Sequence, residues 1–138
     1  MKKHIFMGAM LVALTLVAGG LAMKASSTQQ RPTDVSMVQL IANPREYDGK
    51  FVRVIGFASV IFEGTAVYLH RDDYEYDIPK NGLWIDVDFV KQKRFDQRYV
   101  LIEGTFNAER RGHMGVFSGA IQDIKRLEDW AQVVKTRR

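Results

Sequence analysis

The sequence predicts a mainly β domain: a small, five-stranded Greek-key barrel with a short N-terminal helix, preceded by a signal or anchor helix. Three observations lead to this fold class. An apolar run fills most of residues 1–22, five β-rich runs occupy residues 51–127, and a helix-like segment separates the third β-rich run from the fourth. The chain contains no cysteine, so its core must be stable without disulfides.

The N-terminal segment has the pattern of an export signal. Lys2 and Lys3 precede an uncharged run over residues 5–23 that ends at Lys24. Residues 1–22 are predicted to be either a signal peptide, cleaved after the small-x-small site at residues 20–22, or an uncleaved membrane anchor. Both alternatives place the domain in the periplasm, free or anchored to the inner membrane. A lipid-anchored lipoprotein is excluded because no cysteine follows the run.

Composition divides the rest of the chain into a linker over residues 23–33, a barrel domain over residues 34–130 and a basic tail over residues 131–138. The full chain has 20 basic and 16 acidic residues, and without Lys2 and Lys3 the net charge falls to +2. The high overall charge is therefore no evidence for a polyanion. Together with the compartment, this predicts that nucleic acid is not a partner.

The domain is predicted to begin with a short helix. Val35, Val38 and Ile41 share one face of a predicted helix that Asp34 can cap and that stops at Asn43-Pro44. Residues 44–48 can form a further helical turn. Gly49 is placed to end this turn in a left-handed conformation.

Five strands follow, with the third and fourth separated by a short helix or compact loop over residues 89–97. Gly56 in the middle of the first strand suits a sharp bend, and Gly104 lies on the inner face of the fourth. A tight turn at residues 63–65 joins the first two strands. One or two amphipathic helical turns are expected around Trp130. The predicted strands are residues 51–62, 66–70, 83–88, 99–106 and 114–127.

The order β-β-β-α-β-β is that of the OB-fold. The segments NPREYDGKFVRVIGFASV and RYVLIEGTF also resemble the first and fourth strands of bacterial extracytoplasmic OB-fold-like proteins. This resemblance covers residues 35–127. It implies a barrel architecture but no particular activity, because such families are diverse in function.

Signals for catalysis are sparse. His70 and His113 are the only imidazoles after residue 22, and the chain has no G-x-S-x-G, Gly-rich phosphate loop or H-E-x-x-H. We therefore predict a protein that is not an enzyme, with no catalytic residue, metal ligand or cofactor. A small hydrolase stays open as an alternative.

A second alternative is a haem or metal carrier. The acidic loop over residues 72–77 offers hard oxygen ligands, but its spacing is wrong for an EF-hand. The pair His70 and Tyr74 resembles the haem-attachment motif of the cytochrome c haem chaperone, a membrane-tethered periplasmic OB-fold protein. In that family the motif follows the last barrel strand, whereas here it follows the second.

The candidate binding face lies on the second and third strands, which carry ligands in OB barrels. Alternation places Tyr68 and Trp84 outside the core, where they can stack on a ligand unless the N-terminal helix or residues 72–80 cover them. Basic residues at 91, 93, 94, 98, 137 and 138 are expected to be solvated. The predicted site comprises Tyr68, His70, Tyr74, Tyr76, Trp84 and Asp86.

These observations together predict a non-catalytic, extracytoplasmic OB-like binding or adaptor module of the bacterial cell envelope. Its expected partner is an envelope protein or a small ligand.

Overall fold

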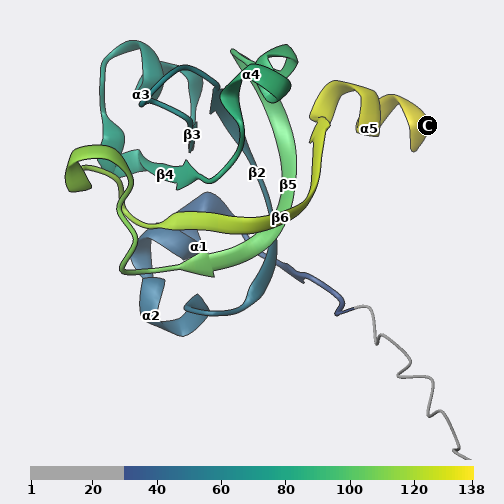
Figure 1. Ribbon diagram of the computed structural model, residues 1–138. Helices are drawn as coiled ribbons and strands as arrows, with labels where there is room; N and C mark the ends of the chain where they lie inside the picture. Colours follow the sequence, from purple (N-terminus) through teal and green to yellow (C-terminus); the bar gives the residue numbers. More distant parts are fainter. Residues whose placement is uncertain (1–29) are drawn as a thin grey trace, which may run out of the picture.

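The computed structural model describes residues 30–138, which form a set of strands joined by short helices and loops (Figure 1). The strands are β1 (Thr33–Asp34), β2 (Phe51–Ser59), β3 (Ala66–Tyr68), β4 (Gly82–Ile85), β5 (Arg98–Asn107) and β6 (Ala120–Asp129). The α-helices are α1 (Met37–Ala42), α2 (Pro44–Tyr47), α3 (Arg71–Glu75), α4 (Phe89–Gln92) and α5 (Trp130–Thr136). The 3-10 helices are η1 (Pro79–Asn81), η2 (Lys93–Phe95) and η3 (His113–Gly115).

Five strands close into a barrel. The order β2-β3-β4-β6-β5 is completed by a pairing between β5 and β2, and only the β4–β6 pair within this ring is parallel. A mainly β fold with five barrel strands and short helices is therefore confirmed, and the strand order is consistent with the predicted OB-like barrel. The two-residue strand β1 adds to the edge of β2 in parallel.

Two glycines allow the barrel to close, as predicted. Strand β2 pairs with β5 along residues 51–58 and with β3 along residues 57–59. A Cβ at Gly56, where the second pairing begins, would lie 2.5 Å from Val67 Cγ2. A Cβ at Gly104, beside a register shift between β5 and β6, would lie 2.7 Å from Ile121 Cγ2. Both positions therefore require close approach of neighbouring strands.

The core fills the barrel and is covered at one end by α1. Met37 and Leu40 of α1 are buried against it, and Val100, Ile102 and Phe106 of β5 point inward as the alternation predicted. The other fully buried core side chains are Val52, Val54, Ala58, Val60, Val67, Leu83, Ile85 and Ile121.

The cap of α1 differs from the prediction. Ser36, not Asp34, is the N-cap: its Oγ accepts a hydrogen bond from Gln39 N at 3.2 Å, and Gln39 Oε1 accepts from Ser36 N at 2.9 Å. This reciprocal pair forms a capping box. Asp34 instead belongs to β1 and pairs with Arg53 at 3.1 Å. The second predicted turn is present as α2, and Gly49 after it has a φ of 73°.

Several boundaries also differ: the first strand ends at Ser59 and the third at Ile85, each three residues earlier than predicted. The second strand ends at Tyr68, because residues 71–75 form α3 in place of the predicted acidic loop. The fifth strand begins only at Ala120, since residues 113–115 form η3 and Gly119 has a φ of 153°. The C-terminal turns form α5, which includes most of the predicted tail and buries Val133.

The signal or anchor segment over residues 1–22 lies outside the described residues. Among residues 30–138, none of the helices has the length and apolar character needed to cross a membrane. The end of the predicted linker contacts the barrel, because Thr33 of β1 pairs with Val52 of β2.

Candidate functional site

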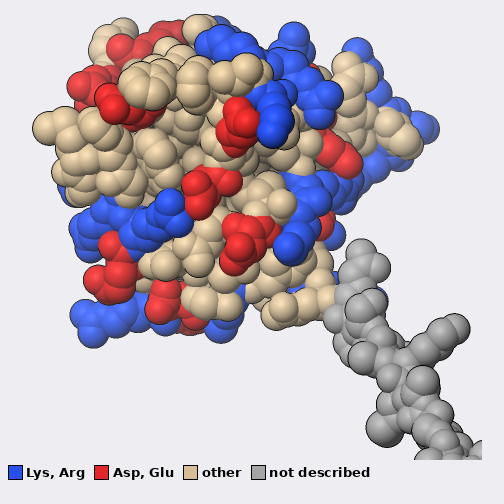
Figure 2. Space-filling model, viewed as in Figure 1, with Lys and Arg blue, Asp and Glu red and all other residues tan. Residues whose placement is uncertain are grey.

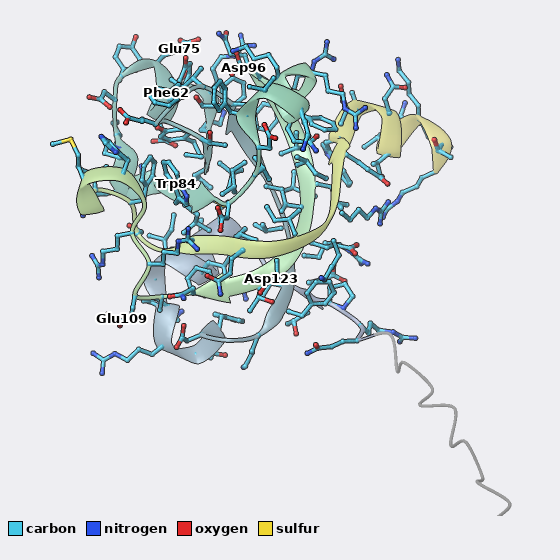
Figure 3. All side chains as sticks on the ribbon, viewed as in Figure 1. Phe62, Glu75, Trp84, Asp96, Glu109 and Asp123 are labelled. Carbon is cyan, nitrogen blue, oxygen red and sulfur yellow. The ribbon has the colours of Figure 1, made fainter. Side chains whose placement is uncertain are left out.

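The outer face of β3 and β4 carries a small second cluster, separate from the barrel core. Its buried residues are Ala66, Tyr68 and Phe117, with Tyr74 and Trp84 packed against them. Figure 3 shows Trp84 beside β4. The alternation pattern therefore placed Tyr68 and Trp84 on the correct side of the sheet.

The expected exposure of this face was wrong for Tyr68, whose side chain is only 7% exposed. Tyr74 of α3 covers it with a ring-centroid separation of 5.7 Å, and Phe117 covers it at 6.1 Å. Burial is the main cause that raises the pKa of the Tyr68 phenol, and the charge of Asp77 adds to this effect. The alternative that residues 72–80 cover this face therefore holds for Tyr74, whereas the second covering residue, Phe117, comes from another segment.

Seven rings form a continuous series of contacts across this side of the barrel. Successive centroids lie between 5.4 and 6.4 Å apart, in tilted or edge-to-face geometry. Such contacts stabilise the packing beyond the area that they bury. The series runs from His70 through Tyr99, Phe57, Tyr74, Tyr68 and Phe117 to Trp84.

The loop over residues 108–119 crosses the outer face of β4. Gly112 lies against the Trp84 ring, and Arg110 pairs with Asp86 at 2.9 Å. The loop also reaches the β2–β3 turn, where His113 Nε2 lies 3.8 Å from Glu63 Oε2. Trp84 and Asp86 of the predicted site are thus both engaged by this loop.

The acidic stretch after β3 has a local structural role. Asp73 is buried; its carboxylate accepts hydrogen bonds from His70 N at 2.9 Å and from Asn81 Nδ2 at 2.7 Å. The exposed His70 ring caps α3 by accepting from Asp72 N. Among residues 30–138, no group of three His, Asp or Glu side chains could hold a metal ion.

The residues of the predicted site do not converge. Tyr74 packs inward on Phe57 and Tyr68, whereas the His70 side chain is exposed and Tyr76 is 76% exposed. The geometry therefore adds no support for a haem site on His70 and Tyr74.

An exposed apolar surface, which the sequence pattern did not predict, lies around the β2–β3 turn and the tip of the loop over residues 108–119. We call it the apolar rim. Phe62, which Figure 3 labels, is 68% exposed. The centroid of its ring lies 5.7 Å from that of Phe89 in α4. The Glu63–His113 pair connects the turn to η3. We define the rim as the exposed apolar side chains of the β2–β3 turn, of α4 and of the loop over residues 108–119, which are Ile61, Phe62, Val90, Met114 and Val116.

A second surface, which we call the basic face, lies around β6 and the start of α5. Three neighbouring hollows of about 460, 740 and 470 Å³ are all lined by Arg126 of β6. Figure 2 shows blue side chains over α4 and α5 and red ones over α3. The basic face consists of Arg31, Arg94, Lys125, Arg126 and Arg137.

The charges on this face fall into two groups. Arg126 bridges Glu103 at 3.1 Å and Glu128 at 2.7 Å; the hydrogen bond to Glu128 is the main cause that raises the pKa of Arg126, and it lowers that of Glu128. These charges largely compensate one another. By contrast, no carboxylate of residues 30–138 lies within salt-bridge distance of Arg31, Arg94, Lys125 or Arg137.

No family model and no curated protein matches this sequence. Among solved structures, the chain is similar to one from the S. pombe Stn1-Ten1 complex, with a TM-score of 0.41 and 10% identity over 79% of this chain and 93% of that one. It is also similar to a structure assigned as an aspartyl-tRNA synthetase from Leishmania major Friedlin, with a TM-score of 0.44 and 13% identity over 75% of this chain. The match spans 22% of the synthetase chain.

The expectation that nucleic acid is not a partner is corrected. One of the similar structures is named for an aspartyl-tRNA synthetase. The physical error lay in the use of net charge. A balance of +2 averages over the whole surface and does not describe single positions such as Arg31, Arg94 and Lys125, which line these hollows without a carboxylate partner among the described residues. At these identities the likenesses concern the fold alone and do not identify a ligand.

Proposed function

We propose that this chain is a non-catalytic adaptor of the bacterial cell envelope, an OB-like module that residues 1–22 export or anchor and that binds a partner protein at its apolar rim. The export pattern of the N-terminal segment supports the location. The apolar rim supports the mode of binding.

The exposed side chains of the rim carry this proposal. Phe62, Val90 and Met114 are 68%, 69% and 84% exposed. They come from three segments that are distant in sequence: the β2–β3 turn, α4 and η3. The Phe62–Phe89 contact and the Glu63–His113 pair link these segments, and exposed apolar side chains on neighbouring segments are typical of protein interaction sites. An aromatic ring and a flexible methionine are side chains that such sites favour.

The position of the rim agrees with the way OB barrels bind. In these barrels the loop between the first two strands and the loop between the last two flank the ligand face. Here the corresponding loops are residues 60–65 and residues 108–119, and the Glu63–His113 pair joins them. Because the face itself is covered by Tyr74 and Phe117, the exposed loop tips offer the contact surface.

The test uses the full chain expressed in cells, with a photo-crosslinking residue at Phe62 or Met114. Both positions should yield the same envelope protein. That protein, once purified, should bind the full chain with at least tenfold lower affinity after Phe62→Ser and Met114→Ser together.

The matched control is Tyr76→Ser with Ile78→Ser. These side chains are also exposed, at 76% and 42%, but they lie between α3 and η1, outside the rim. The control pair should leave affinity unchanged. Equal losses in both pairs, or crosslinks to nucleic acid instead of protein at Phe62 and Met114, would rule out a protein partner at the rim.

A further inference from the structure

The basic face adjoins the point at which the described chain begins. Gln30, Arg31 and Pro32 line the 740 Å³ hollow together with Lys125 and Arg126. Gln30 lies only seven positions after Met23 in the chain. Fully extended, a segment of this length spans about 25 Å at most. If residues 1–22 remain in a membrane, this face cannot lie far from the membrane surface.

The charges that face outward here are free to bind an anion. Arg31, Arg94, Lys125 and Arg137 have no carboxylate partner within salt-bridge distance among residues 30–138. Four aspartates also line the hollows. Three of them are paired with other basic side chains, Asp86 with Arg110, Asp88 with Lys91 and Asp129 with Arg98, whereas Asp123 has no such partner among the described residues. The acids Glu103 and Glu128 are already bound by Arg126. Each basic residue held near an anionic bilayer strengthens binding to it.

We infer that the basic face docks the barrel on anionic lipid headgroups of the membrane that holds residues 1–22. This inference rests on the anchored form of the proposed function. Trp130, the first residue of α5, is half-buried beside the face, and the Arg137 guanidinium lies 5.6 Å from the centroid of its ring. Tryptophan next to basic residues is typical of protein surfaces at the headgroup level.

A lipid surface fits this face better than single-stranded nucleic acid does. Proteins that bind single strands stack bases on exposed aromatic rings next to basic side chains. On the basic face, Phe95 is buried, and the Arg94 guanidinium lies 4.7 Å from the centroid of its ring. The Arg137 guanidinium lies over the Trp130 ring in the same way. The face thus offers charge without an open stacking surface.

The two tryptophans provide the readout. The full chain is reconstituted in vesicles of phosphatidylcholine alone, or of phosphatidylcholine mixed with phosphatidylglycerol, each carrying a nitroxide-labelled headgroup as quencher. In the Trp84→Phe background, Trp130 should be quenched more strongly in the anionic vesicles. In the Trp130→Phe background, Trp84 on the other side of the barrel should be quenched equally in both. Added salt should remove the difference.

A charge-removal series tests which residues are responsible. Arg31→Gln, Arg94→Gln and Lys125→Gln together should reduce the quenching of Trp130 in anionic vesicles to its level in neutral ones. The control triple, Arg45→Gln, Lys80→Gln and Arg111→Gln, removes the same charge from α2, η1 and the loop over residues 108–119 and should have no effect. Equal effects of the two triples, or equal quenching of Trp130 in the two lipids, would overturn the inference.

The outcomes also separate this inference from the anchor. Failure of the full chain to float with neutral vesicles would disprove the anchor alone, because the response of Trp130 to anionic vesicles still reports on the basic face. A single-stranded oligonucleotide provides the remaining comparison. Binding to it that the first triple abolishes, without any preference of Trp130 for anionic lipid, would assign the face to nucleic acid and reject the lipid surface.

Discussion

Gly112 lies so close to Trp84 that a Cβ at position 112 would stand 2.5 Å from Trp84 Cε3. This contact holds the loop over residues 108–119 against β4, and through Phe117 it also covers Tyr68. The backbone at Gly112 has a φ of 65°, a conformation that side chains disfavour. One glycine thus combines a required backbone conformation with a required absence of side chain.

Replacing this glycine should detach the loop. Gly112→Ala should lower the free energy of unfolding by about 2 to 4 kcal/mol, through strain at φ 65° and ψ −158°, a region that essentially only glycine adopts, and through overpacking against the indole. Acrylamide quenching of Trp84, measured in a Trp130→Phe background, should increase. The control is Gly115→Ala, where φ is 66° but nothing lies within 4 Å of the added Cβ. It should cost about 1 kcal/mol and leave the quenching unchanged. Identical results for the two variants would contradict the contact.

Two tyrosines of the predicted binding face should differ sharply in their contribution to stability. Tyr68 is 7% exposed and Tyr76 is 76% exposed. Tyr68→Ala should therefore destabilise the protein by about 3 to 5 kcal/mol, whereas Tyr76→Ala should change stability by less than about 0.5 kcal/mol. Urea denaturation of the two variants measures both values. A Tyr68→Ala protein as stable as the parent would mean that Tyr68 is exposed in solution.

Acid should weaken the junction between β6 and α5. Asp129 accepts a hydrogen bond from Arg98 Nη1 at 2.8 Å, the main cause that lowers its pKa, and a further bond from Ala131 N at 2.9 Å. Because the folded pKa is below the unfolded value of about 3.9, this carboxylate stabilises the protein above that pH. The stabilisation is lost as the pH falls through the folded pKa.

The variant Asp129→Asn isolates this effect, since asparagine can still cap α5 but carries no charge. Its melting temperature should be below that of the parent at about pH 7, and the two curves should converge at about pH 2. A gap of constant size over this range would show that the charge of Asp129 does not stabilise the fold.

Export can be tested without the barrel. Residues 1–30 fused to a reporter that is active only outside the cytoplasm should give activity, because basic residues, an apolar run and a polar segment follow one another in the order of an export signal. Activity only from a cytoplasmic reporter would contradict the prediction. Intact mass of the mature protein then distinguishes cleavage after residue 22 from a retained anchor.

Local sequence patterns by themselves determined much of the barrel. Alternation identified five strands and the inward face of β5, and the glycines at positions 56 and 104 marked close approaches, because strand periodicity and missing side chains are properties of a few consecutive residues. The cap of α1 was misassigned between Asp34 and Ser36. Both residue types can cap a helix, and the pairing of β1 with β2 decided which of them is free to do so.

The surface was decided by tertiary structure. Periodicity correctly placed Tyr68 outside the barrel core, but Tyr74 and Phe117 bury it, and Phe117 lies 49 positions away along the chain. In the same way, η3 brings His113 to Glu63 of the β2–β3 turn, and Lys125 of β6 lines one hollow with Arg31 and another with Arg94. The periodicity of a sequence shows which residues share one face of a strand. Which distant segments cover that face depends on the paths of the loops, and these paths are determined only when the barrel closes.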